Sequence, residues 1–508
     1  MAFVSFENSS EALPVEPPSD TGFLKNVLLR ILLTGPLRFK GLIILPFLTR
    51  LFPRELYGVW LQIILVKIVL SGVVTLRLET AVVRYFSSEP DAKRIIRGVL
   101  AVTVLCSLAL MLILLSFGES ISRVVFGVEK YHTLFLPVAL WIFVSASMQV
   151  GLAVLRSREK IVSLSVREAL SAVWMVVSVT IAYWLQLDIL ALIVLCILGD
   201  VALLAWVLAQ IGFAVPKVFS YKSFYLNRKY VVYSLPLVAG FLLLWITNSI
   251  DRFVIVNMLG LDNVATYGVM SQYSSLLTAV LNPINFILFP KVAACWEAKD
   301  KSGVQRYFSQ AFALSFLLGA PCIVGLWAIS DGAITLLAGG KYLASPLVIL
   351  FILLSILLAR IYVGNQYVFH LLNKTYLLPF IYGATAAMSF VLCYVFTLRW
   401  GLVGAGLSRF VTFLAAACIL TIFVRRKIPS PIPFGVSIKA AGAALVMGGV
   451  VYWLPKTTWP QLLICVAAGA SVYFALLFLL GVLKLSMLLH LKNSFFNSLG
   501  RIQGKPIE

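Results

Sequence analysis

Long uninterrupted apolar blocks constrain the fold of this chain more than any other feature of its sequence. The blocks are roughly 20 residues long, the length at which a helix crosses about 30 Å of hydrocarbon. They lack the alternating polar positions of a porin strand, which favours helices over a β-barrel. With 61% hydrophobic and 12% charged residues and a mean hydropathy of +1.00, the sequence predicts an all-α polytopic membrane protein of about 14 transmembrane helices. We expect the spans at roughly 27–48, 58–78, 97–117, 133–155, 165–185, 188–213, 231–257, 264–290, 308–329, 345–370, 376–397, 401–424, 437–454 and 460–483.

The positive charges predict an orientation in the membrane. The net charge is +21, and the cations gather in short clusters between the apolar blocks. If the N-terminus is cytosolic, the cytosolic connections hold 24 Lys and Arg residues and the opposite connections hold seven. Because positive loops stay on the cytosolic side, both termini are expected there, and the charge indicates membrane lipids and no nucleic acid as partners. Residues 1–22 are acidic and proline-bearing, which predicts a disordered cytosolic tail, and 486–508 form a second cytosolic tail.

Metal and enzyme chemistry have no support in the sequence. The seven cysteines lie far apart without CxxC or CxxH spacing, and the three histidines His132, His370 and His490 are widely separated. We therefore expect no metal, no cofactor and no enzyme activity. The enzymatic alternative is a membrane polysaccharide polymerase or ligase, which would need an ordered catalytic segment outside the membrane. No connection on the outer side exceeds roughly 20 residues.

A weak internal repeat divides the chain. Tyr57-Gly58 recurs 210 positions later as Tyr267-Gly268, and Lys130-Tyr131 recurs 211 positions later as Lys341-Tyr342. Six spans per repeat is an even number, so the two halves are expected to be parallel, as in many transporters. The sequence therefore predicts two six-helix lobes, 23–215 and 216–428, followed by a helix pair at 429–485.

Ionisable residues inside the apolar spans form the candidate site. A charged group at the centre of a span costs about 2.5–3.5 kcal/mol on insertion scales, so it normally faces a protein interior or a watery cavity. The predicted cavity cations are Arg38, Lys67, Arg252, Arg360 and Arg409. The predicted polar cavity residues are Asn248, Asp251, Gln272, Asn282 and Asn285.

The sign of these charges indicates an anionic substrate. The spans contain five deep cations but few acids, chiefly Asp200 and Asp251. Guanidinium groups bind phosphate or diphosphate through paired hydrogen bonds that are strong in a low-dielectric cleft. An ion-coupled antiporter for drugs or organic cations, the main alternative, would need carboxylates instead. The structural alternative is that Asp251 and Arg252 pair with other helices only to hold the bundle together.

Several segments carry a family resemblance. The most specific is 248–294, with Asp251-Arg252, Leu259-Gly260, Tyr267-Gly268 and Pro290. Further matches are LTRLFPRELYGVW, ETAVVRYF, VLRSREK and GLVGAGLSRF, although Pro53 stands where Gly is more common. Over roughly residues 25–425 the chain resembles the polysaccharide flippase family, of O-antigen or exopolysaccharide type, within the multidrug/oligosaccharidyl-lipid/polysaccharide exporter superfamily.

The resemblance implies a transporter that flips an undecaprenyl-diphosphate-linked oligosaccharide from the cytosolic to the periplasmic leaflet of a bacterial inner membrane by alternating access. Arg38, Lys67 and Arg252 would then bind the diphosphate, while Arg360 and Arg409 would line the second lobe. Coupling to an H⁺ or Na⁺ gradient, known for some relatives, would involve Asp200 or Asp251. Polysaccharide polymerase or assembly proteins would be partners. The choice among lipopolysaccharide O-antigen, capsule and exopolysaccharide stays open.

Overall fold

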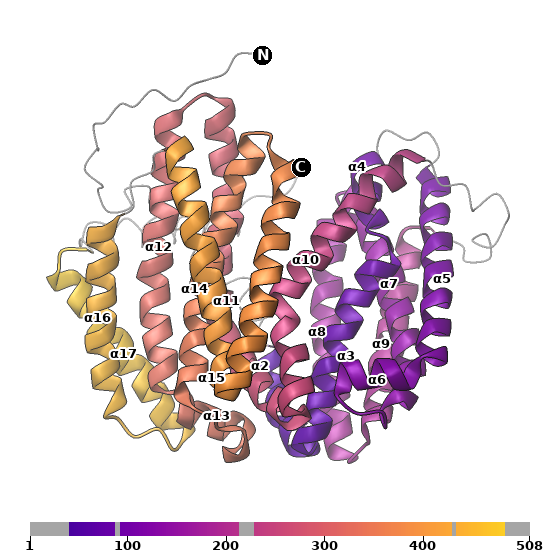
Figure 1. Cartoon of the computed structure of the whole chain (residues 1–508), viewed down its shortest axis with the longest axis horizontal. Coiled ribbons are helices and arrows are strands. Elements are labelled where there is room, and N and C mark those ends of the chain that lie inside the picture. The colour runs from indigo at the N-terminus through magenta and orange to yellow at the C-terminus, as the bar shows by residue number, and fades with distance from the viewer. Residues whose placement is uncertain (1–39, 87–91, 213–227, 429–432, 483–508) are drawn as a thin grey trace, which may run out of the picture. The chain divides into compact units, whose positions relative to one another are not determined.

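The computed structural model describes residues 40–86, 92–212, 228–428 and 433–482, which form helices joined by short connections (Figure 1). The predicted tails 1–22 and 486–508, and the candidate cation Arg38, lie outside the described residues. The α-helices are α2 Lys40–Leu51, α3 Arg54–Val74, α4 Leu78–Tyr85, α5 Ala92–Ser116, α6 Gly118–Phe126, α7 Phe135–Ser157, α8 Ile161–Trp184, α9 Ile189–Gln210, α10 Arg228–Leu259, α11 Leu261–Glu297, α12 Lys301–Ala328, α13 Ser330–Ala338, α14 Pro346–Leu371, α15 Leu378–Lys427, α16 Phe434–Tyr452 and α17 Trp459–Leu479.

The long helices confirm the predicted membrane architecture. Twelve stretches of the described chain are long and apolar enough to cross a membrane. One of them contains α15, which holds two predicted spans and breaks at Gly401, where φ is 54° and ψ is −132°. The short helix α2 is the described end of the first predicted span. The chain is therefore an all-α polytopic membrane protein with about 14 spans, as the apolar blocks predict.

Local sequence signals explain where several helices begin. The Asp188 side chain accepts a hydrogen bond from the Ala191 amide at 2.8 Å and caps α9. Thr458 caps α17 in a capping box, in which the Gln461 side chain accepts from the Thr458 amide at 3.2 Å. Asp300 caps α12 by accepting from the Gly303 amide at 2.8 Å. These side chains satisfy amide groups that have no partner within the first turn of a helix.

Outward-facing apolar side chains mark the lipid-facing surfaces. Leu112 of α5 is 62% exposed, Ile438 of α16 is 69% exposed and Leu463 of α17 is 69% exposed. In water, an apolar surface of this extent would drive the protein to associate, whereas the hydrocarbon of a bilayer solvates it. The protein is therefore an integral membrane protein with several spans.

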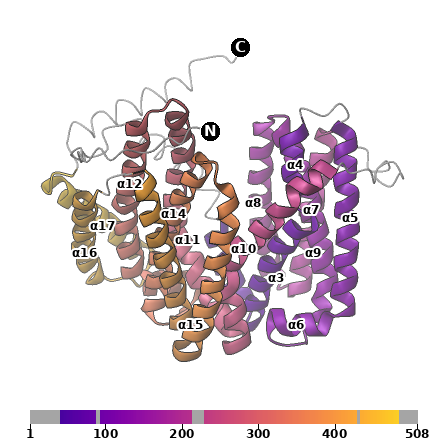
Figure 2. The same cartoon turned by 45° about the horizontal axis from the view of Figure 1, so that its top comes forward.

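Three short helices were not predicted from the sequence: α4, α6 and α13. Both α6 and α13 contain nine residues, and they begin at positions 118 and 330. Each is followed within a few residues by a Lys-Tyr pair, at Lys130-Tyr131 and Lys341-Tyr342. Figure 2 shows α6 lying across the ends of the long helices beside it.

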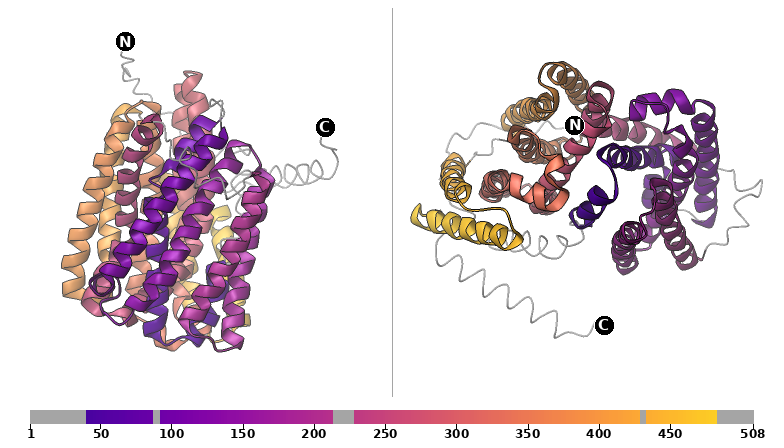
Figure 3. Two further views of the ribbon diagram at one scale, coloured as in Figure 1. Left: turned by 90° about the vertical axis from the view of Figure 1, so that its right-hand side faces the viewer. Right: turned by 90° about the horizontal axis from the view of Figure 1, so that it is seen from below.

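The described residues cluster into two compact units. The N-unit contains Lys40–Val269 and Pro379–Ala405, and the C-unit contains Met270–Leu378 and the described residues from Gly406 onward. Within each unit the long helices run side by side, as two further views show (Figure 3). The unit boundaries fall inside α11 and α15 and differ from the predicted boundaries at 215/216 and 428/429. The division into six, six and two spans stays a prediction.

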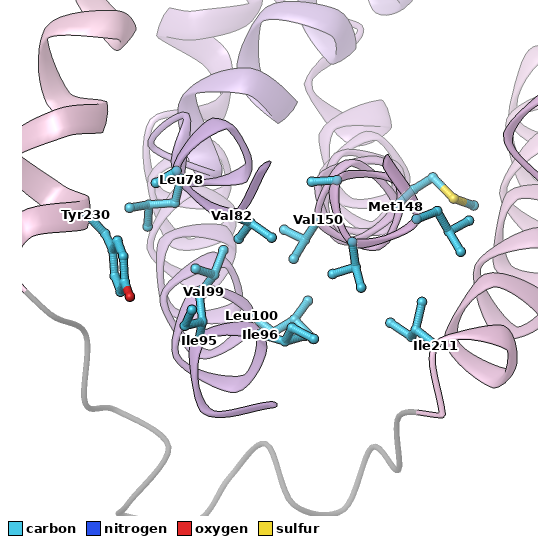
Figure 4. Close-up of a cluster of buried hydrophobic side chains, with 14 of the residues drawn as sticks. Leu78, Val82, Ile95, Ile96, Val99, Leu100, Met148, Val150, Ile211 and Tyr230 are labelled. Atoms are coloured by element: carbon cyan, nitrogen blue, oxygen red, sulfur yellow. The ribbon is translucent and has the colours of Figure 1, made fainter. Parts of the chain in front are cut away.

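Buried apolar side chains fix α4 inside the N-unit (Figure 4). Leu78 and Val82 of α4 are at most 1% exposed and belong to one cluster with residues of α5, α7, α9 and α10. Close packing of this kind makes loss of even one methylene unfavourable. The cluster consists of Leu78, Ala81, Val82, Ile95, Ile96, Val99, Leu100, Ala101, Met148, Val150, Ala153, Val154, Leu155, Val207, Ile211 and Tyr230.

Helices α3 and the start of α11 approach each other through the two copies of the repeated Tyr-Gly pair. A Cβ on Gly58 would clash with the carbonyl oxygen of Leu261, and a Cβ on Gly268 would clash with the side chain of Leu61. Small residues at such crossings allow helix backbones to pack closely inside a membrane. The repeat found in the sequence therefore becomes a reciprocal contact within the N-unit.

Candidate functional site

Lys67 lies in a polar cluster inside the N-unit. It projects from α3, and its Nζ lies 3.9 Å from the centroid of the Trp141 ring on α7. The same Nζ is 4.0 Å from Oδ2 of Asp200 on α9, and the Trp141 Nε1–H donates to that Oδ2 at 2.8 Å. The side chains of Lys67 and Asp200 are only 18% and 19% exposed. The structure thus brings together a predicted cavity cation and a predicted coupling acid, with an indole between them.

Arg167 of α8 joins this cluster by its charge. The guanidinium interacts electrostatically with Asp200 and with the exposed Glu168, and its buried Nε has no hydrogen-bond partner. Arg167 is a site residue that the sequence did not indicate, because it follows the basic segment 156–160 closely and has the same signal as a cation of a cytosolic connection. Only the fold shows its approach to α9. One carboxylate, Asp200, therefore faces two cations, Lys67 and Arg167.

A second predicted pair, Asp251-Arg252, lies in α10. Asp251 is 5% exposed, and its Oδ2 accepts from the Tyr267 hydroxyl at 2.7 Å. Its Oδ1 accepts from the Arg252 backbone amide at 2.9 Å. Arg252 is half-buried, and the described residues include no ion pair for its guanidinium. Asn248, one turn earlier, is exposed and donates to the Leu244 carbonyl at 2.7 Å.

In the C-unit, Arg360 of α14 meets the polar face of α11. Its Nη1 donates to the Asn282 Oδ1, and the Asn285 Nδ2 donates to the Arg360 carbonyl at 3.0 Å. The Tyr367 hydroxyl donates to the Asn285 carbonyl at 3.2 Å. The structure therefore joins three predicted site residues, a cation and two amides, across the contact between two helices. Amide oxygens stabilise the guanidinium without neutralising its charge.

The remaining predicted site residues, Arg409 and Gln272, make contacts within their own helices. The Arg409 guanidinium lies 5.9 Å from the centroid of Phe413, one turn further along α15. The Gln272 backbone carbonyl accepts from the Ser275 hydroxyl at 2.6 Å. These contacts lie within a single helix in each case. The cavity roles of these two residues stay predictions.

An ion-pair group that the sequence did not indicate surrounds the start of α3. The Lys130 Nζ lies 2.7 Å from Oε1 of Glu55, and the Tyr131 hydroxyl donates to the same oxygen at 2.9 Å. The hydrogen bond to Glu55 raises the pKa of the Lys130 ammonium. Nearby, Arg123 pairs with Glu129 and lowers the pKa of that carboxyl. No sequence spacing connects these residues, because Glu55 lies 76 positions from Tyr131.

Metal ligation is not a feature of this part of the chain. Within 40–86, 92–212, 228–428 and 433–482, no group of three or more His, Cys, Asp or Glu side chains could hold a metal ion. The polar chemistry of the described spans is therefore that of ammonium, guanidinium, amide and carboxylate groups. Such groups bind anions and polar hydroxyl-rich molecules.

Comparison with known proteins places this geometry in a family. The family model described as "Polysaccharide biosynthesis protein" matches residues 47–347. The chain belongs to this polysaccharide biosynthesis protein family. A search of curated protein sequences gives no match. The assignment agrees with the resemblance that the segment 248–294 carries in the sequence.

Solved structures share the fold. The lipid II flippase MurJ, in an inward closed conformation, matches at a TM-score of 0.71 and 15% identity, covering 88% of this chain and 98% of that chain. An inward-facing multidrug resistance MATE family transporter of the MOP superfamily matches at 0.65 and 14% identity, covering 80% and 98%. A MOP superfamily transporter from Pyrococcus furiosus, described as having a binding pocket of reverse polarity, matches at 0.59 and 13% identity, covering 82% and 96%. At these identities the likeness concerns the fold alone.

Proposed function

We propose that this protein flips a lipid-linked oligosaccharide, carried on undecaprenyl diphosphate, from the cytosolic to the outer leaflet of a bacterial inner membrane. The acyl chain stays in the lipid while the diphosphate and sugars pass the cations of the spans. Both termini lie in the cytosol in this proposal, as the distribution of Lys and Arg predicts. The flipped product would then serve a polysaccharide polymerase, and an H⁺ or Na⁺ gradient would drive the cycle.

The observation that carries the proposal is the excess of positive charge around Asp200. Lys67 lies 4.0 Å from this one carboxylate and Arg167 interacts with it electrostatically, while the described residues offer Lys67 no second acid within ion-pair distance. Uncompensated charge is unfavourable in a low-dielectric interior, so the cluster favours an anionic ligand. A diphosphate supplies that charge together with several acceptor oxygens.

The C-unit supports the same substrate class. The Arg360 guanidinium donates to the neutral amide of Asn282, so this contact orients the cation and leaves its charge in place. Asn285 and Tyr367 fix this part of α14 against α11, since the Asn285 amide donates to the Arg360 carbonyl and the Tyr367 hydroxyl donates to the Asn285 carbonyl. The Pyrococcus furiosus transporter has a similar fold and a binding pocket described as reversed in polarity, which is consistent with substrates of different charge on this architecture.

The antiporter alternative fits these contacts less well. A cavity for organic cations needs carboxylates that are available to the ligand. Asp200 accepts from Trp141, and Asp251 accepts from Tyr267, so each acid already binds a protein donor. The cationic groups Lys67 and Arg167 would also repel an organic cation near Asp200.

Complementation tests the proposal. In a strain that lacks its own flippase, Lys67→Met and Arg360→Gln should each lower surface polysaccharide by about tenfold or more, because each removes a cation that stabilises the diphosphate in transit. Lys439→Ala is the matched control, since Lys439 is an exposed cation of α16 whose Nζ donates to the Leu480 carbonyl. Membrane levels of all variants are measured in parallel by immunoblot.

A purified assay separates the two functions. Protein in liposomes should move a polyprenyl-diphosphate-linked N-acetylglucosamine between leaflets, and the Lys67→Met variant should not. Normal surface polysaccharide in both cation variants at equal expression would contradict the proposed role of these residues. Export of the cationic dye ethidium without movement of the lipid-linked sugar would favour the antiporter.

A further inference from the structure

The C-unit contains a pocket that the proposed transport does not use. The pocket has a volume of about 420 Å³, and its lining residues are Asp331, Gly332, Thr335, Leu454, Lys456 and Thr457. Its walls are the start of α13 and the connection between α16 and α17, which lie at the same end of the C-unit (Figure 1). Because α12 and α16 end here and α17 begins here, the pocket lies at the level of the lipid headgroups.

Backbone contacts hold the two walls together. A Cβ on Gly332 would clash with the carbonyl oxygen of Lys456, so α13 lies directly against the connection. The Lys456 Nζ donates to the Ala328 carbonyl at 2.8 Å, which ties the connection to the end of α12. The capping box at Thr458 then begins α17. A pocket with walls fixed in this way is preformed, so a ligand binds without the cost of ordering the chain.

The pocket contains one acid and one cation that do not form an ion pair with each other. Asp331 is exposed in the first turn of α13, and among the described residues its carboxylate has neither an ion pair nor a hydrogen bond. Lys456 is half-buried, and its bond to Ala328 uses one of the three N–H groups of the ammonium. Opposite charges held apart in one pocket match a zwitterion, whereas an anionic headgroup would need an excess of cations.

Two threonine hydroxyls distinguish between the zwitterionic headgroups. The Thr335 hydroxyl donates to the Asp331 carbonyl at 2.7 Å, and the Thr457 hydroxyl donates to Oε1 of Gln461 at 2.8 Å. Each hydroxyl has one proton, so both present only acceptor lone pairs to the pocket. Together with the carboxylate they match a primary ammonium, which has three N–H donors. A trimethylammonium has no donor, so the acceptors favour phosphoethanolamine over phosphocholine.

Aromatic side chains beside the pocket indicate a bilayer surface. Tyr452, Trp453 and Trp459 flank the connection, and all three are exposed. Such rings gather at the headgroup level, where one end of the side chain is apolar and the other is wet. The connection carries a single cation, Lys456, so the distribution of Lys and Arg predicts that it lies on the outer side. The ligand that these features match is a phospholipid of the outer leaflet.

We propose that this pocket binds the headgroup of a phosphatidylethanolamine molecule, with its ammonium on Asp331 and its phosphate on Lys456. Thr335 and Thr457 accept from the remaining N–H groups of the ammonium, while the acyl chains stay in the hydrocarbon. The bound lipid bridges α13 and the connection, and so stabilises this end of the C-unit. The site goes beyond the proposed function, because its residues take no part in the clusters proposed to bind the transported substrate.

Native mass spectrometry of the purified protein in detergent micelles tests the site. The protein is mixed with dioleoyl phosphatidylethanolamine, or with the phosphatidylcholine or phosphatidylglycerol of the same acyl chains, and the bound lipids are counted. Wild-type protein should bind the ethanolamine lipid about tenfold more tightly than either of the others. Asp331→Asn should lose this preference. Lys456→Gln, which keeps a donor for the Ala328 carbonyl, should weaken binding of the ethanolamine lipid by a similar factor.

Glu119→Gln is the matched control. Glu119 is the second residue of α6, as Asp331 is of α13, and it is exposed and does not line the pocket. This variant should bind all three lipids as wild-type protein does. Thermal unfolding without added lipid shows that each variant is folded. Thr335→Val is a milder second variant, in which binding of the ethanolamine lipid alone should weaken several-fold.

Three lipid results would overturn the proposal: equal affinity of wild-type protein for the three lipids, tighter binding of phosphatidylglycerol, or a preference for the ethanolamine lipid that survives in both Asp331→Asn and Lys456→Gln. A sugar is the other ligand class that the carboxylate and hydroxyls could bind, and free chitotriose is the probe for it. Displacement of the ethanolamine lipid by chitotriose would assign the pocket to a sugar and overturn the proposal as well.

Discussion

The two units solve the problem of a cation within a membrane span in different ways. In the N-unit, Lys67 has a carboxylate 4.0 Å away and an indole ring 3.9 Å away. In the C-unit, Arg360 donates to the amide oxygen of Asn282, and Asn285 binds its backbone carbonyl. The first arrangement gives a compact ammonium a carboxylate that it shares with Arg167, whereas the second orients a planar guanidinium through an amide oxygen. Equal charge in two halves of one chain therefore does not mean equal demand for a substrate anion.

The difference indicates which cation responds more strongly to loss of its neighbour. An ammonium in low dielectric depends on its counter-ion, while a guanidinium spreads its charge over three nitrogens and is more weakly hydrated. We therefore expect loss of the neighbouring group to lower stability more at Lys67 than at Arg360, while both cations bind the substrate anion. The following substitutions separate stability from substrate binding.

The largest effect is expected at the carboxylate. Asp200→Asn removes the counter-ion of Lys67 and should lower the free energy of unfolding by about 3 kcal/mol, because an uncompensated charge remains in the span. Thermal unfolding in detergent micelles measures the change. The double variant Lys67→Met, Asp200→Asn should recover much of the loss, since it removes both charges. A double variant as unstable as the single one would show that Lys67 and Asp200 do not act as a pair.

A smaller effect is expected at the amide. Asn282→Ala removes one acceptor of Arg360 and should cost about 1–2 kcal/mol of unfolding free energy, because a buried donor is left without this partner. The rate at which a lipid-linked sugar is flipped in liposomes should fall even under conditions where the variant remains folded. If unfolding shifts as much as in Asp200→Asn, the contrast between the two units is wrong.

Exchanging the cation types sharpens the contrast. Arg360→Lys keeps the charge but loses the planar fork, so transport should fall several-fold while the melting temperature changes by only about 2–4 °C. Lys67→Arg enlarges the group beside Trp141 and should lower the melting temperature more than it lowers transport. For each variant, the fall in transport is divided by the fall in melting temperature, and this ratio should be larger for Arg360→Lys than for Lys67→Arg. Equal ratios would remove the distinction between the units.

The smallest effect is expected at an exposed pair, which serves as the reference. Arg123 holds the pKa of Glu129 below its ordinary value of 4.5. The stability that this pair contributes is complete above about pH 4.5 and is lost as the pH falls through the lower pKa of the folded state. Arg123→Gln should therefore change the melting temperature slightly near neutral pH and not at all in strong acid. A loss near neutral pH as large as that of Asp200→Asn would mean that burial is not what distinguishes Lys67.

The sequence was sufficient for the spans but not for everything that lies between them. Apolar blocks of about 20 residues leave a helix as the stable way through hydrocarbon, so every predicted span with described residues is helical. Helices α4, α6 and α13 contain eight or nine residues, too few to produce a distinct apolar block. The left-handed backbone at Leu76-Arg77 also carries no glycine that would have indicated a break.

The candidate site was predicted residue by residue but not as a set of contacts. A charge inside an apolar block is visible in sequence, which is why Lys67, Asp200 and Arg360 were found. Their partners follow from tertiary packing: Trp141 lies 59 positions from Asp200, and Asn282 lies 78 positions from Arg360. Arg167 was missed because a cation near a span end has the same sequence signal as one in a loop. Sequence periodicity indicates the face of a helix but not the helix that it meets.

The close approach at Gly58 has a consequence for how this gene can change. Any missense codon at a glycine position adds a Cβ, and at Gly58 that atom would meet the backbone oxygen of Leu261. No exchange of a neighbouring side chain can make room beside a backbone atom. At Gly268 the obstacle is the side chain of Leu61, so a second-site change there can restore the fit. Suppressor selection should therefore recover revertants of Gly268→Ala at codon 61, and revertants of Gly58→Ala only at codon 58 itself.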